Sequence, residues 1–541
     1  MKAVPLVPTL LLALGVAAAA RGQAAPQADR LLVMPFDNIN REARLYWLVE
    51  GSSVLVSEDL AGMGVDAITR DERLRAFERL QLPPAAVLSD ATVIKVARLL
   101  GATEVVTGTI SLEGEDLTVK SRSINLELGR LTLEAVERGA LTDLPVIFER
   151  VARRLRPGAV QSAPGEGERP PLSALEDYIK GLVAETPAGQ TKFLDSALKT
   201  YPSYAAARIA LWQVHTSQGD HARALQAVLG VPERSPAYRR SRFLAALSEI
   251  GEQQYDAAYV RLKALAGPAP SAAVFNNLGV IQVRRGSAPR TERAAYYFAK
   301  ATEADRSDPD YYFNLGYAYW LDHDPETAIY WLKETVRRNP LDGDAHLLLG
   351  VALRSTGAEV EGDREKDLAR RLSPSDAGWE RRPDAGGDGV PRGLERLKQD
   401  LADSGRNLVD ATLAPGEQRD HRELAAFHLE RGRRMFAEQN DREAITDLKR
   451  AVFLLPYQAE AHLLLGRIYV RAGQLQEGIE ELRLSLWSEE TVPAHLALAE
   501  AYLQAKDPAA ARAEVKSALS LDPNSEDARR LLGRIGPEKG A

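Results

Sequence analysis

The chain has 541 residues and a formal net charge of −7, from 69 Lys and Arg against 76 Asp and Glu, and it contains no cysteine. The lack of cysteine excludes disulfides, thiol catalysis and lipid attachment through an N-terminal cysteine. The nearly balanced charge argues against a nucleic-acid partner, because nucleic-acid binding needs a basic stripe on the surface.

Residues 1–25 have the composition of a secretory signal. Lys2 supplies a positive charge, residues 6–20 form an apolar run, and small residues follow up to a cleavage point near Ala24 or Ala25. The run is shorter than the roughly 20 apolar residues that span a bilayer. We therefore expect a cleaved signal and a periplasmic or secreted bacterial protein. The alternative is an uncleaved leader that anchors the chain in the membrane.

Residues 30–157 alternate between strand-like and helix-like patterns. Short apolar runs predict strands at 31–38 and 65–69, and three longer strand-like runs follow residue 103, separated by hairpin turns at 113–116 and 128–130. Apolar residues at helical spacing predict helices over 46–62, 71–80, 91–100 and 142–155. The pattern predicts a small α/β domain with a mixed sheet.

This part of the chain resembles the amino-terminal domain of TolB and the related CsgG- and FlgO-like domains of the bacterial cell envelope. The resemblance rests on LLVMPFDN, on the predicted helix after it and on the run ARLLGATEVVTGTISLEGEDLTVKSRSI. In that run a helix ending in Gly101-Ala102 precedes a strand of the form x-V-V-x-G-x-I. The resemblance implies a docking domain without catalytic activity. Gly108 within this strand predicts a bulge or a close approach to a neighbour.

Residues 158–171 have the composition of a linker. After them the chain repeats a helix–turn–helix pattern of about 34 residues, which resembles the tetratricopeptide repeat (TPR). The pattern is clearest in residues 310–340, where small residues, Gly316 and Ala328, let two helices approach and Pro340 ends the second helix. Larger side chains fill the space between the helices at Tyr312, Leu315, Tyr319 and Leu332.

The repeats fall into two blocks, array one at residues 172–375 and array two at residues 421–541, with about eight or nine hairpins in all. Array two ends in a capping helix, because a terminal repeat must expose a polar outer face. Between the blocks, residues 376–420 predict a flexible linker or insertion, although residues 394–409 could form a helix. The pattern leaves open whether the blocks form one superhelix or two. The predicted fold class is α+β multidomain, a small α/β domain followed by an all-α TPR solenoid.

Catalytic motifs are absent from the sequence. It contains no G-x-x-x-x-G-K-[ST] phosphate loop, no H-E-x-x-H and no G-x-S-x-G. His346, His462 and His495 occupy one position in three repeats, and the repeats hold them apart, so we interpret them as packed core residues. We expect no catalytic residue, no cofactor and no metal, and we interpret the chain as a non-enzyme.

Three aromatic side chains of one repeat are candidates for partner binding. Phe313, Tyr317 and Trp320 are spaced four and three residues apart and so share one helix face. The TPR resemblance implies that this face lines the concave groove, where exposed aromatic residues often dominate binding. The alternative is that they pack against an insertion near Arg290 or against the adjacent repeat.

Two asparagines, Asn277 and Asn314, precede the Leu-Gly pair by one residue in successive repeats. In TPR proteins that bind extended peptides, an asparagine here bonds the ligand backbone, since an amide both donates and accepts. The basic residues that would hold a C-terminal carboxylate are missing, because the next repeat offers Asp344 and Leu348. An internal peptide segment is therefore the better ligand. The alternative is that asparagine is simply common at this position.

The sequence therefore predicts an exported scaffold that binds a protein or peptide partner in its TPR groove and associates with the envelope membrane through a partner. The alternative is a ligand-binding or sensor protein that acts through the α/β domain, with a polar pocket near Asp37, Asn38 and Thr107.

Overall fold

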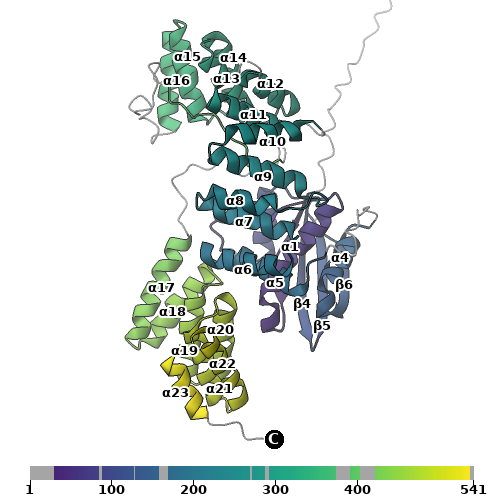
Figure 1. Ribbon diagram of the computed structural model, residues 1–541, viewed down its shortest axis with the longest axis vertical. Coiled ribbons are helices and arrows are strands. Elements are labelled where there is room, and N and C mark those ends of the chain that lie inside the picture. The colour runs from purple at the N-terminus through teal and green to yellow at the C-terminus, as the bar shows by residue number, and fades with distance from the viewer. Residues whose placement is uncertain are drawn as a thin grey trace, which may run out of the picture.

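The computed structural model describes residues 30–83, 88–126, 128, 130–157, 169–267, 271–286, 292–372, 390–401 and 421–535. A small mixed sheet with its helices comes first, and a long series of helices follows, as the predicted fold class requires (Figure 1). The predicted signal at 1–25 and most of the predicted linker at 158–171 lie outside the described residues.

The sheet has the order β3-β1-β4-β5-β6, with β2 paired to β4. β1 runs parallel to β3 and β4, whereas β4, β5 and β6 form an antiparallel meander. The sheet is therefore mixed, as the sequence predicts. The strands are β1 (Arg30–Val33), β2 (Asp37–Asn38), β3 (Asp66–Ala67), β4 (Glu104–Glu113), β5 (Asp116–Asn125) and β6 (Arg130–Ala140).

Helices cover both faces of this sheet. Successive side chains of a strand point to opposite faces, and Leu31 packs with α1 (Tyr46–Gly62) and α4 (Leu144–Leu155), whereas Leu32 packs with α2 (Arg70–Arg79) and α3 (Asp90–Leu99). Burial on both sides explains why β1 is a continuous apolar run. Two short 3-10 turns, η1 (Ala43–Leu45) and η2 (Leu141–Asp143), precede α1 and α4.

Gly108 lies where the sheet leaves no room for a side chain. A Cβ atom there would come within 2.6 Å of the Lys120 carbonyl oxygen on β5 and 2.7 Å of the Phe36 ring. The predicted close approach is confirmed, with Phe36 packed over the strand at this point.

Array one and array two consist of helices packed in consecutive pairs, nine pairs among the described residues, and α23 closes the second array. Array one contains α5 (Leu172–Val183), α6 (Pro187–Thr200), α7 (Ala205–Ser217), α8 (His221–Leu229), α9 (Tyr238–Gly251), α10 (Tyr255–Ala266), α11 (Ala272–Arg285), α12 (Ala294–Ala304), α13 (Pro309–Leu321), α14 (Pro325–Arg338), α15 (Gly343–Ser355) and α16 (Glu359–Leu372). Array two contains α17 (His421–Ala437), α18 (Asp441–Leu454), α19 (Ala459–Arg471), α20 (Leu475–Ser488), α21 (Val492–Gln504), α22 (Pro508–Leu521) and α23 (Glu526–Ile535).

In four of the pairs, a glycine on the first helix faces a leucine on the second. A Cβ at Gly316 would lie 2.8 Å from the Leu332 side chain, and one at Gly466 would lie 2.6 Å from Leu482. Any larger residue would push the helices apart. The predicted reason for the small repeat positions is thereby confirmed.

The α/β domain and array one share a continuous core. One apolar cluster runs from Leu31 and Val33 of the sheet through α1 to Leu175 and Ile179 of α5. Gln213 of α7 also donates a hydrogen bond to Asp71 of α2, at 3.1 Å. The sheet domain therefore packs against the first repeat and covers its end, and it is not tethered to array one by the linker alone.

The two arrays form two separate stacks. α16 and α17 are consecutive helices, yet they lie far apart in Figure 1, and array two lies beside α5, α6 and the sheet domain. The repeat pattern leaves open whether the two blocks form one superhelix or two, and the structure shows two.

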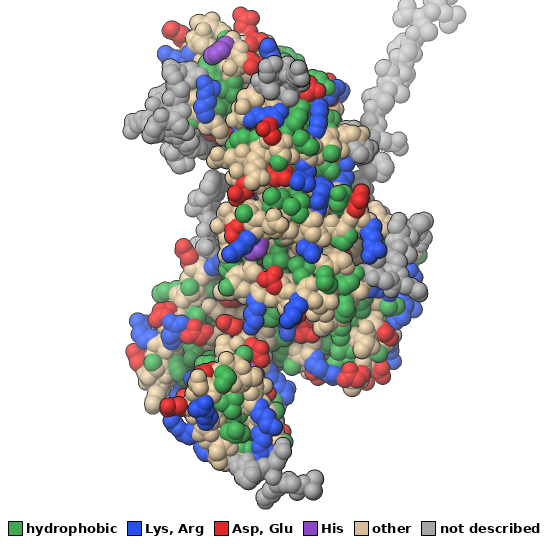
Figure 2. Space-filling model, in the orientation of Figure 1, with side chains coloured by type: hydrophobic (Ala, Val, Ile, Leu, Met, Phe, Trp, Pro, Cys, Tyr) green, Lys and Arg blue, Asp and Glu red, His purple; other side chains and the backbone are tan. Residues whose placement is uncertain are grey.

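Basic and acidic side chains are interspersed over the face shown in Figure 2, as expected from the nearly balanced charge.

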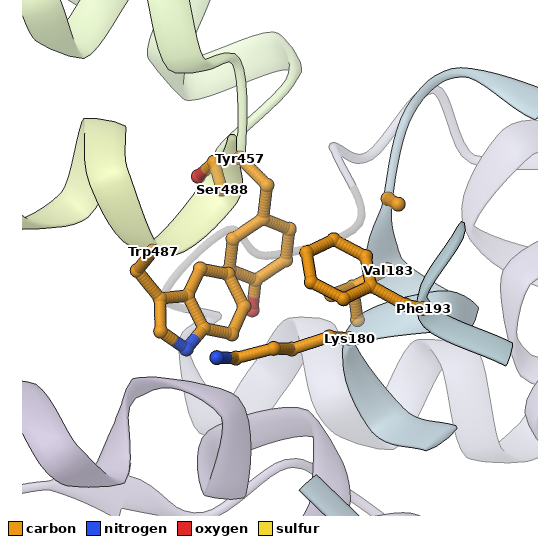
Figure 3. Close-up of a pocket in the computed structure, with 7 residues that line it drawn as sticks. Lys180, Val183, Phe193, Tyr457, Trp487 and Ser488 are labelled. Atoms are coloured by element: carbon orange, nitrogen blue, oxygen red, sulfur yellow. The ribbon is translucent and has the colours of Figure 1, made fainter. Parts of the chain in front are cut away.

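Aromatic residues mediate the contact between the arrays (Figure 3). The Trp487 ring of α20 lies 5.1 Å from the Tyr457 ring, and Lys180 of α5 places its ammonium 5.8 Å from both the Trp487 and the Phe193 rings. The space that remains between these residues is about 10 Å³, room for about one water molecule. This is a packed interface and not a ligand pocket.

Candidate functional site

Residues 390–401, here called the groove segment, lie extended along the first helices of three successive pairs in array one, α11, α13 and α15. The prediction of a helix over 394–409 is wrong for its described part, because residues 394–401 form no helix. In a helix, backbone N–H and C=O groups would bond one another four residues apart. In this segment, backbone groups form hydrogen bonds with side chains of array one instead.

Asn314 and Asn277 hold the groove segment by its backbone. Asn314 donates from Nδ2 to the Arg396 carbonyl at 2.8 Å and accepts the Arg396 N–H at 2.7 Å. Asn277 does the same with Lys398, at 2.8 and 2.9 Å. An extended chain repeats its geometry every two residues, so two asparagines one repeat apart bind residues i and i+2.

Asn276 links these two asparagines. Its Nδ2 donates to the Arg396 carbonyl at 2.8 Å and to Asn277 Oδ1 at 3.1 Å, and its Oδ1 accepts from Asn314 Nδ2 at 2.7 Å. All three amides are fully buried. A buried amide that lost its partner would cost free energy, so the network needs a polypeptide backbone in place to be satisfied.

The Arg396 side chain lies between two carboxylates and an aromatic ring. It makes a bidentate ion pair with Asp342 at 2.6 and 2.7 Å and a third contact with Asp310 at 2.8 Å. Its guanidinium carbon is 3.8 Å from the Phe313 ring centroid. Burial lowers the pKa of the guanidinium, but the bonds to Asp342 and Asp310 outweigh burial, so the pKa is raised overall.

Lys398 occupies the neighbouring position in the same way. Its ammonium lies 2.5 Å from Asp308 and 2.6 Å from Asp310, and 5.0 Å from the centre of the Tyr311 ring. Burial raises the pKa of the Asp310 carboxyl, whereas Arg396 and Lys398 lower it by more, so this pKa lies below its ordinary value. Asp308, Asp310 and Asp342 together are called the acidic pocket below.

Other residues of the groove segment also contact array one. Glu395 pairs with Arg284 of α11 at 2.7 Å, and Asp400 pairs with Arg240 of α9 at 3.1 Å. Apolar residues of the segment, Val390, Leu394, Leu397 and Leu401, join the clusters of array one. The segment therefore runs from the later repeats toward the earlier ones, opposite to the order of the array.

The three predicted aromatic residues lie beneath this segment and are not exposed. Phe313 and Tyr317 are fully buried and stack at 6.3 Å, and the Tyr317 hydroxyl donates to the Pro391 carbonyl at 3.1 Å. Burial raises the pKa of Tyr317 to about 12, and Glu395 contributes. Trp320 is 9% exposed and shares an apolar cluster with Val390. The expected alternative contact near Arg290 lies outside the described residues.

Sequence reasoning missed the acidic pocket. Asp344 and Leu348 argue against a carboxylate ligand, and the same lack of basic residues favours a cationic one. The residues that carry the acidic charge are Asp308 and Asp342, N-caps of α13 and α15, and Asp310 in the first turn of α13. Capping is the usual reason for aspartate at these positions. An aspartate there therefore gives no sign in the sequence that it also binds a cation.

The repeat histidines pair with carboxylates on the partner helix. His346 bonds Glu365 at 2.5 Å, His462 bonds Glu481 at 2.6 Å and His495 bonds Glu514 at 2.7 Å, and the partners are 19 positions apart in the sequence in each case. Each pair ties the first helix of a hairpin to the second. Among the described residues, no group of three or more His, Asp or Glu side chains is arranged to hold a metal ion.

The residues of the predicted polar pocket in the α/β domain have other contacts. Asn38 donates to the Glu42 carbonyl at 2.9 Å and accepts the Glu42 N–H at 3.2 Å, so its amide closes the turn before η1. Thr107 accepts from Arg122 at 3.1 Å. Asp37 is exposed and the other two are partly exposed.

Comparison with known proteins confirms the repeats. Models of the tetratricopeptide repeat match residues 290–337, 429–490 and 492–535. No curated protein matches the chain. Solved structures that resemble parts of it include YrrB, titled a TPR protein with an unusual peptide-binding site, at 19% identity over 34% of this chain and 92% of that chain, with a TM-score of 0.28. MamA matches at 18% identity over 31% of this chain and 98% of its own (TM-score 0.28), and PilF of Pseudomonas aeruginosa at 18% over 35% and 85% (TM-score 0.30).

The matched regions are therefore tetratricopeptide repeats, which are protein-interaction modules and typically not enzymes. The resemblance of the sheet domain to TolB and its relatives has no counterpart among the family matches. Within the described residues, no helix combines the length and apolar character needed to cross a membrane.

Proposed function

We propose that this chain is an exported bacterial scaffold that binds an extended segment of a partner protein in the groove of array one. The observation that carries the proposal is the pair Asn277 and Asn314, each of which bonds both the N–H and the C=O of one residue of an extended backbone. Such contacts depend on the backbone and not on one side chain, so they suit a polypeptide ligand in general.

The sequence supports the proposed location of the scaffold. The signal-like residues 1–25 support export to the periplasm or beyond, and the resemblance of residues 30–157 to envelope domains supports a docking role there. The shared core of the sheet domain and array one supports the view that docking and peptide binding occur in one rigid body. Association with the envelope membrane then runs through the partner.

The test is photo-crosslinked capture from envelope extracts with the full chain, comparing the wild type with Asn277→Ala/Asn314→Ala. The expected result is one partner that crosslinks to array one and is lost in the double variant. Phe453→Ala is the control, because this side chain is 58% exposed on α18, away from the groove. If every captured protein binds the double variant as well as the wild type, the proposed function is wrong.

A further inference from the structure

The groove segment carries a specific pattern of charge. Two cations at alternate positions, Arg396 and Lys398, enter the acidic pocket, and both have an aromatic face beside them. A third cation of the same segment, Arg392, is exposed. The groove therefore discriminates between cations of one short sequence by their position.

The chemistry of the pocket explains this discrimination. Asp342 is 5% exposed at its side chain and meets Arg396 through two parallel bonds, the geometry in which a guanidinium pairs best with a carboxylate. Asp308 is equally buried and meets a single ammonium. A buried carboxylate without a cation is costly, so an occupant that lacks these charges leaves the pocket uncompensated.

We infer that the groove of array one selects extended segments of the form Arg-x-Lys, and that the groove segment of this chain is a built-in competitor which a partner must displace. The inference rests on the proposed function and adds the class of ligand and the mode of regulation. A partner presents an internal, extended stretch with Arg and Lys two residues apart and apolar residues beside them.

Tethering sets the strength of the competition. A segment joined covalently at both ends meets its site at an effective concentration on the order of millimolar. An external peptide of equal intrinsic affinity therefore binds only the fraction of molecules whose groove is open, and its apparent affinity falls by that fraction. Weakening the groove segment without touching the groove raises the affinity for an external peptide.

The experiment uses a fluorescently labelled peptide with the sequence of residues 390–401, VPRGLERLKQDL, and full-length protein in an anisotropy titration. Against the wild type, binding is weak. Against Arg396→Ser/Lys398→Ser, which alters the groove segment and leaves array one intact, the peptide binds at least tenfold more tightly. Adding Asn277→Ala/Asn314→Ala to that variant lowers the affinity at least tenfold again.

Matched controls separate position from charge. In the peptide, Arg392→Ser leaves the affinity for the opened protein unchanged, whereas Arg396→Ser/Lys398→Ser abolishes binding. In the protein, Gln399→Ser, at an exposed residue of the groove segment, leaves peptide binding as weak as in the wild type. A helical circular-dichroism spectrum at the temperature of the titration shows that array one stays folded in the groove-segment variants.

Equal peptide affinity for the wild type and for Arg396→Ser/Lys398→Ser would overturn the inference of a competitor. Equal affinity for peptides with and without the two cations would overturn the selectivity. If the opened protein ignores the peptide but still captures a partner that depends on Asn277 and Asn314, the inference fails and the proposed function stands. If neither peptide nor partner depends on the asparagines, both fail.

Discussion

At the scale of single residues, the groove depends on side chains that do two things at once. Asn314 donates to and accepts from one residue of the groove segment, and Asp342 caps α15 while it pairs with Arg396. Few other side chains offer both a donor and an acceptor at fixed geometry. Substitutions at such positions therefore change the site and its support together.

A second residue-scale feature is the close approach at Gly108. We expect Gly108→Ala to destabilise the sheet domain by about 1–3 kcal/mol, because the new Cβ overlaps the backbone oxygen of Lys120 and the Phe36 ring. Thermal unfolding followed by circular dichroism measures this as a lower melting temperature.

Gly62→Ala is the matched control for that prediction, since a Cβ at Gly62 meets no atom within 4 Å. Its effect should stay within about 0.5 kcal/mol. Equal melting temperatures for the two variants would show that the sheet does not pack as described at Gly108.

At the scale of elements, a histidine and a glutamate tie the two helices of several hairpins together. Burial lowers the pKa of His495, but Glu514 of α22 and Glu490 before α21 raise it by more, so its pKa lies above the ordinary value. A pKa raised by folding means that the protonated pair stabilises the native state below the unfolded value of about 6.5. That stabilisation is lost as the pH rises through the folded pKa.

We therefore predict that His495→Asn lowers the melting temperature more at pH 6 than at pH 9. His323→Asn serves as the control, since His323 is an exposed turn residue at a positive φ that asparagine adopts readily. Its effect should be small and the same at both pH values. A penalty for His495→Asn that grows with pH would contradict the assigned pairing.

The elements also show what the sequence could and could not predict. The helix pairs were predictable, because a small residue facing a large one, as at Gly316 and Leu332, leaves a period in the chain. The groove segment leaves no period. Its backbone partners lie 82 and 121 residues away, so its extended conformation depends on contacts that no local pattern records. The two asparagines were found only because they recur with the repeat, and Asn276 and the acidic pocket were missed.

At the scale of the whole molecule, the chain folds back on itself. Array two does not continue array one but lies against α5 and the sheet domain through Trp487 and Tyr457 (Figures 1 and 3). This fold leaves residues 373–420 to connect the far end of array one to array two, and the groove segment is the described part of that connection. The covalent path between the arrays thus passes through the binding groove.

We predict that Trp487→Ala/Tyr457→Ala releases array two and increases the radius of gyration in small-angle X-ray scattering, because the docking surface loses its two aromatic rings. Phe453→Ala, at an exposed ring of array two, should leave the radius of gyration unchanged. An unchanged value for the double variant would mean that other contacts hold the arrays together.

The claim on which the whole account depends is that array one holds an extended polypeptide by its backbone. Hydrogen exchange of the full-length protein, resolved at the amides of Arg396 and Lys398, tests it most directly, because these N–H groups donate to Asn314 and Asn277. We predict slow exchange in the wild type and fast exchange in Asn277→Ala/Asn314→Ala. Exchange in the wild type at the rate of an unstructured peptide would contradict the account.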